Sequence, residues 1–223
     1  MILNTKDNLK ALLHRLIFLA KISTELADKR DLAEHWEHLF LSLQRYYQGE
    51  GVTGLLLLYP SYAIHILESS SDILYSILRD LKEMKKTQED RAMVMKPRIL
   101  VISHNIPNRL FQEWNCNLLD DPDKKNPFHG GPTEHIINEC ITKILKLGMY
   151  MNMQAKTARG TSDPISEKAP ELLIPQEAIC YLLECDELLT PELFLQTYDC
   201  PLNIIMDSDL VWPPPVPIKP VEM

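Results

Sequence analysis

Hydrophobic residues along the chain occur in two patterns, short continuous runs and spacings of three and four residues. Short runs are typical of buried strands, whereas the longer spacing is typical of one face of a helix. The patterns predict strands at 12–20, 52–58, 62–67 and 98–103, and helices within 28–47 and 73–86. This order predicts an α+β ferredoxin-like sandwich, an antiparallel or mixed sheet with two helices on one face. We expect one core to hold Phe18, Leu56, Ile64, Leu67, Ile77 and Ile99.

The second half of the chain is organised differently, because stretches rich in proline and polar residues separate its apolar segments. We expect four parts: an α+β domain over 1–120, a hinge and helix over 121–154, a linker over 155–170, and C-terminal helices with a proline-rich tail over 171–223. Within them the pattern predicts helices at 133–153 and 175–188, a short helix starting at Thr190-Pro191, and a last strand at 203–206.

Composition excludes several classes of protein. Hydrophobic residues make up 45% of the chain and charged residues 24%, which is the balance of a globular protein. The formal net charge of −8 argues against nucleic acid as a partner. No apolar run approaches the roughly 18 residues of a membrane span. Residues 1–13 carry three charges where a signal peptide would be apolar, and the five cysteines are sparse, so we expect a reduced, cytoplasmic protein without membrane insertion.

Few residues suggest catalytic or metal chemistry. His35 and His38 lie three apart on a predicted helix, a spacing that can chelate a metal, but a third ligand is missing. His65 has the chemistry of a general base, and a hydrogen-bonded structural histidine is the favoured interpretation. Neither a C-x-x-C pair nor a G-x-S-x-G elbow occurs. We therefore expect no catalytic residues and no bound metal.

Four segments resemble a known family. The segments are RLIF at 15–18, GVTGLLL at 51–57, HILE at 65–68 and RLFQEW at 109–114. In this order and spacing they resemble the core of BLUF domains, bacterial blue-light sensors that bind FAD. The resemblance covers about residues 12–120. It implies a BLUF-like version of the ferredoxin-like fold, with the C-terminal helices as an extension.

The same resemblance identifies the positions on which flavin photochemistry depends in that family. The family tyrosine corresponds to Phe18, its asparagine to Tyr47 and its glutamine to His65, so all three differ, while the tryptophan is retained as Trp114. Phe18 lacks a hydroxyl, and the larger Tyr47 would crowd the flavin ring. We expect the scaffold to be retained, the photochemistry to be lost, and no cofactor to be bound.

The whole chain is also similar to a vertebrate family expressed in the testis, which implies a protein of male germ cells. Our leading hypothesis is a non-enzymatic adaptor with protein partners, the sperm flagellum being one candidate location. The alternative is a flavin or small-molecule sensor that uses the cleft between its two helices. In the tail, Pro214, Pro217 and Lys219 form a P-x-x-P frame followed by a cation, as in polyproline ligands. The same tail has a second interpretation, in which Trp212 anchors it to the protein's own domain.

Overall fold

The computed structural model describes residues 12–48, 51–86, 92–119, 128, 130–157 and 169–199. Five strands form one sheet: β1 (His14–Ile22), β2 (Thr53–Leu58), β3 (Tyr62–Ser69), β4 (Val94–Ser103) and β5 (Trp114–Leu118). The helices are α1 (Arg30–Tyr47), α2 (Ser71–Lys86), α3 (Thr133–Thr157), the short 3₁₀ helix η3 (Pro170–Leu172), α5 (Gln176–Leu183) and α6 (Pro191–Tyr198). No helix in this described part is long and apolar enough to cross a membrane.

The sheet has the strand order β4-β1-β3-β2-β5. The first four strands pair antiparallel, and β5 is added parallel to β2. Together with α1 and α2, those four strands have the connectivity of a ferredoxin-like sandwich, so the predicted fold class is confirmed. The sequence pattern did not predict β5 as a strand, because its five residues include two asparagines and are only partly buried.

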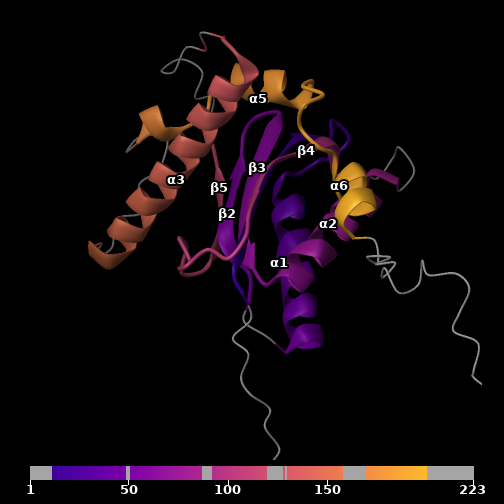
Figure 1. The fold of residues 1–223 in the computed structure, drawn as a ribbon. Helices are drawn as coiled ribbons and strands as arrows, with labels where there is room; N and C mark the ends of the chain where they lie inside the picture. Colours follow the sequence, from indigo (N-terminus) through magenta and orange to yellow (C-terminus); the bar gives the residue numbers. More distant parts are fainter. Residues whose placement is uncertain are drawn as a thin grey trace, which may run out of the picture.

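Both faces of the sheet are covered by helices (Figure 1). On one face the strand residues Phe18, Leu56, Leu67 and Ile99 pack with Ile77 of α2 in a first core beneath α1 and α2, as expected. On the other face, alternate strand residues pack against α3 and α5. Ile64 belongs to this second core, so its placement with the others was wrong: it follows Ala63 and precedes His65, whose side chains point to the opposite face.

Three boundaries differ from the prediction by four residues or more. β4 begins at Val94 rather than 98, and Pro97 is accommodated where the register with β1 shifts and Lys96 has a φ of 47°. α5 ends at Leu183 rather than 188. α3 continues to Thr157, into the region predicted as a linker. The predicted strand at 203–206 and the proline-rich tail lie outside the described residues.

Candidate functional site

The centre of the first core is a group of aromatic side chains around His65, which we call the aromatic cluster: Phe18, Trp36, Phe40, His65 and Trp114. His65 is completely buried on β3. Its ring centroid lies 5.3 Å from that of Phe18 on β1 and 5.1 Å from that of Trp36 on α1, both edge to face. Trp36 and Phe40 lie one helical turn apart and stack on each other, with centroids 6.0 Å apart. The cluster therefore joins α1 to three strands.

One hydrogen bond fixes the protonation state of His65. The Trp114 indole Nε1–H donates to His65 Nε2 over 2.9 Å. Because an indole can only donate, Nε2 must be unprotonated and the neutral ring carries its proton on Nδ1. Burial lowers the pKa of His65 to about 3, and Nδ1 has no hydrogen-bond partner among the described residues. So low a pKa makes the ring a poor proton acceptor near neutral pH, which favours the structural interpretation of this histidine.

A buried carboxylate holds the loop that precedes Trp114. Glu68 is fully buried at the end of β3, and its Oε1 lies 2.6 Å from Nη2 of Arg15. Its Oε2 accepts hydrogen bonds from the backbone N–H groups of Leu110 (2.9 Å) and Phe111 (3.2 Å). Ion pairing and backbone donors together compensate for removing the charge from water. Glu68 therefore fixes the start of the segment that leads into β5.

Arg109 completes this network from the loop itself. Its Nη1 donates to the Thr53 hydroxyl over 2.9 Å and to the Glu68 carbonyl oxygen over 2.8 Å. The four sequence segments that resemble BLUF domains thus meet in space, and the Glu68 network places Trp114 against His65. The sequence alone did not show this coupling, because its partners lie more than 40 residues apart.

Tyr47 has a different role from the other three family positions. Its hydroxyl lies 2.9 Å from the Ser76 hydroxyl, which itself donates to the Asp72 carbonyl oxygen. The tyrosine thereby links the end of α1 to α2 at the rim of the first core. Of the sequence-predicted positions, the structure brings Phe18, His65 and Trp114 together in the aromatic cluster. Pro214, Pro217 and Lys219 lie outside the described residues.

The other candidate residues have ordinary structural partners. His35 Nε2 bonds to Asp80 Oδ2 at 2.9 Å, so it links α1 to α2 instead of pairing with His38. Within the described ranges no three His, Cys, Asp or Glu side chains are placed to hold a metal ion. Burial raises the pKa of the Cys116 thiol to about 11 and that of Cys140 to about 12.

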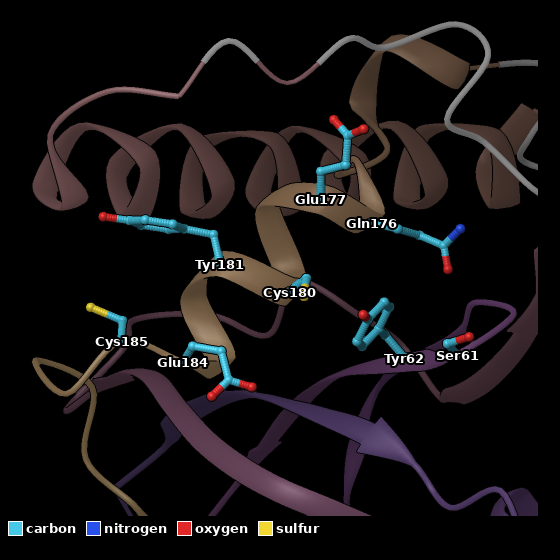
Figure 2. A pocket seen from close by; sticks show the side chains of 8 residues that line it. All are labelled: Ser61, Tyr62, Gln176, Glu177, Cys180, Tyr181, Glu184 and Cys185. Carbon is cyan, nitrogen blue, oxygen red and sulfur yellow. The ribbon is translucent and has the colours of Figure 1, made fainter.

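Several cavities lie outside the aromatic cluster. Figure 2 shows one of them, an open groove of about 790 Å³ beside α5, which Glu177, Cys180, Tyr181 and Glu184 line together with Tyr62. A second, of about 390 Å³, lies between β4, α2 and α6. A third, of about 180 Å³, lies between α3 and the start of α5. The described residues that line the groove beside α5 include carboxylates and thiols but no histidine that could act as a general base.

Comparison with solved structures finds similarity to BLUF proteins. The chain is similar to BlrB, a BLUF protein in its dark state, with 16% identity and a TM-score of 0.36 over 50% of this chain and 74% of that one. It is similar to Klebsiella pneumoniae BlrP1 with FMN and cyclic diGMP, with 18% identity and a TM-score of 0.36 over 49% and 26% of the two chains. A bacterial light-regulated adenylyl cyclase matches with 17% identity and a TM-score of 0.37 over 66% and 36%.

A family model matches most of the chain. The model described as testis-expressed protein 47 matches residues 12–200, which include β1 to β5, the helices of both faces and α6. The aromatic cluster and the Glu68 network both lie within this match. On this evidence the chain belongs to the testis-expressed protein 47 family.

Proposed function

We propose that this protein is a non-enzymatic adaptor of male germ cells, in which a sensor-like fold serves as a rigid scaffold for protein partners. The observation that carries the proposal is the aromatic cluster. His65 is completely buried, Trp36 is 1% exposed and Phe40 is 8% exposed. The side chains at the flavin-related positions Phe18 and His65 are enclosed by aromatic side chains of the protein itself, which supports a fold that works without a cofactor.

A flavin does not fit these residues. A ring system set against His65 would have to displace Trp36 and Phe40, which stack on each other and both contact the histidine. Tyr47 would have to give up its hydrogen bond to Ser76 to open the end of the cleft. Moving several packed aromatic side chains out of a core costs several kcal/mol. We therefore assign no cofactor-dependent step to this protein.

The chemistry of two of the four described thiols also supports a non-enzymatic role. A nucleophilic cysteine acts as its thiolate, which requires a low pKa and an accessible, electropositive site. Cys116 and Cys140 have the opposite environment, because burial raises their pKa values to about 11 and about 12. Neither thiol is therefore suited to nucleophilic catalysis.

The partner contact that we propose lies in the tail, at Pro214, Pro217 and Lys219. Proline restricts φ and favours an extended rod, so little conformational entropy is lost when such a segment docks in an aromatic groove. To test this, proximity labelling in male germ cells would compare the natural chain with the double variant Pro214→Ala, Pro217→Ala. The matched control is Pro213→Ala, which changes a proline that belongs to no P-x-x-P frame.

We expect the double variant to lose a set of labelled proteins that the natural chain and the control retain, with the melting temperature unchanged in all three. Identical labelled sets would contradict the tail as the contact. A labelled set in which no protein is enriched over unfused labelling enzyme would contradict the adaptor function itself.

One observation favours the second candidate function, a small-molecule sensor. The His65 Nδ1–H is buried without a partner among the described residues, and a ligand with a carbonyl oxygen would satisfy it. Nitrogen NMR of histidine-labelled protein separates the two functions. If flavin or a related carbonyl compound shifts the His65 Nδ1 resonance, the sensor is supported. A His65 Nδ1 resonance that stays unchanged at the highest compound concentration supports the adaptor function.

A further inference from the structure

Two histidine side chains outside the aromatic cluster converge at one end of the sheet. His14 is the first residue of β1, and His104 follows the last residue of the neighbouring strand β4. Their Nδ1 atoms lie 3.0 Å apart, and the two rings meet edge to face with centroids 5.1 Å apart. The two residues lie 90 positions apart in the sequence, so no local spacing indicates this pair.

Backbone hydrogen bonds hold the pair in place. The Ile106 N–H donates to the Leu13 carbonyl oxygen over 2.9 Å, which ties the segment after β4 to the residue before β1. Asn105 has a φ of 54°, and its N–H donates to His14 Nδ1 over 3.4 Å. Because a backbone N–H can only donate, His14 Nδ1 is an acceptor, and the proton between the two rings is carried by His104 Nδ1.

The distance between the two Nδ1 atoms suits a metal ion bound by both. An imidazole nitrogen binds a divalent transition metal ion at about 2.0–2.1 Å. Two such bonds place their nitrogen atoms about 2.9 Å apart at the right angle of a tetragonal ion, and about 3.3 Å apart at the tetrahedral angle. The observed distance of 3.0 Å lies between these values. A small rotation of each ring therefore lets an ion take the place of the shared proton.

A buried hydroxyl beside the pair lacks a partner. Ser69 of β3 is directly opposite His14 in the register of the sheet, so the two side chains project from the same face. Ser69 is 0% exposed, and its Oγ has no hydrogen-bond partner among the described residues. Leaving a buried hydroxyl unsatisfied costs free energy. A water molecule bound to an ion at the pair would satisfy it.

We propose that His14 and His104 form a structural site for a divalent transition metal ion, which their Nδ1 atoms bind and water molecules complete. On binding, the His104 ring releases its Nδ1 proton to solvent and takes one up at Nε2, so the ring stays neutral and no net proton is released. His104 is exposed, which gives the ion and the proton a path from solvent. This proposal revises the expectation of no bound metal, which rested on His35 and His38.

Isothermal titration calorimetry of the full-length chain with Ni²⁺ tests this proposal, because Ni²⁺ binds imidazole and accepts tetragonal geometry. The test variants are His14→Gln and His104→Gln, each of which removes one of the two nitrogen ligands. The matched control is His35→Gln, which makes the same change at a histidine bonded to Asp80. The melting temperature of each protein without metal shows whether it is folded.

We expect each test variant to bind Ni²⁺ at least about tenfold more weakly than the natural chain and the control, because losing a ligand costs at least as much as losing its supporting group. Ni²⁺ should also raise the melting temperature of the natural chain and the control, but not that of the test variants. If His14→Gln does not fold, the exposed position in His104→Gln decides the outcome.

Three results would overturn the proposal: no saturable Ni²⁺ binding by the natural chain, full binding by a folded test variant, or an equal loss in His35→Gln. The last result would show scattered binding by surface histidines. Failure here would leave the adaptor proposal intact, because that proposal rests on the aromatic cluster and on residues 214–219.

Discussion

Protonation of His65 should make the stability of this protein depend strongly on pH. In the folded protein burial lowers the pKa of His65 to about 3, whereas an unfolded histidine has a pKa near 6.5. As the pH falls below 6.5 the unfolded chain binds a proton that the folded chain excludes. The contribution is therefore complete above pH 6.5 and is lost progressively as the pH falls toward 3.

The size of this effect follows from the two pKa values. Between them the free energy of unfolding changes by about 1.4 kcal/mol per pH unit. From pH 7 to pH 5 the buried histidine alone should remove about 2 kcal/mol. For a domain of this size, that loss corresponds to a melting temperature lower by about 4–8 °C.

The assay compares urea unfolding of the natural chain with that of His65→Gln at both pH values. Glutamine can accept the Trp114 indole N–H through its side-chain oxygen but does not titrate. Burial, and then the nearby His104, lower the pKa of His14. Because His14 is present in both proteins, its contribution cancels when the two losses of stability are subtracted. We expect the natural chain to lose about 2 kcal/mol more than the variant. Equal losses would refute the buried, neutral His65.

Four further substitutions or deletions test the rest of the structure. Glu68→Ala leaves the Arg15 guanidinium without its buried partner and should lower the free energy of unfolding in urea by about 3–5 kcal/mol, with a red shift of tryptophan emission. A loss below about 1 kcal/mol would contradict the network. Leu56→Ala should cost about 2–5 kcal/mol, because Leu56 is 1% exposed in the first core, and full stability would show that the site is not packed. Gly54→Ala should abolish soluble expression, because the new Cβ would lie 2.0 Å from the Ile66 carbonyl oxygen of β3 and the φ of +154° disfavours a side chain. A well-folded variant would contradict the register of β2 against β3. Deleting residues 213–223 should leave the melting temperature unchanged, whereas a marked drop would show that this part of the tail packs on the fold.

The fold could be predicted where local pattern and environment agree. β1, β2 and β3 are buried on both faces, so their apolar runs were informative. α1 shows its buried face directly in the spacing of Leu32, Trp36 and Phe40. β5 has no such signal, since its pairing with β2 and its contact with α1 are set by the tertiary structure. The start of β4 was missed because Pro97 disfavours a strand unless a bulge accommodates it.

Most residues of the candidate site could be predicted from the sequence, but the contacts between them could not. The positions of Phe18, His65 and Trp114 followed from the order of the sequence segments. Trp36 and Phe40 were recognisable as a helix face, but their contact with His65 depends on which face of the sheet that helix covers. Glu68 is a charged residue at the end of a strand, where exposure is the usual expectation. Its burial depends on Arg15 and on the loop at 109–111, which no local pattern indicates.

The central claim is that the protein's own aromatic side chains close the place where a flavin would bind. The most direct measurement is the absorption spectrum of the full-length protein after gentle purification, followed by titration with FAD in equilibrium dialysis. We predict no flavin band after purification and no saturable FAD uptake at micromolar protein. A stoichiometric flavin band, or saturable FAD binding by the natural chain, would contradict the closed cluster.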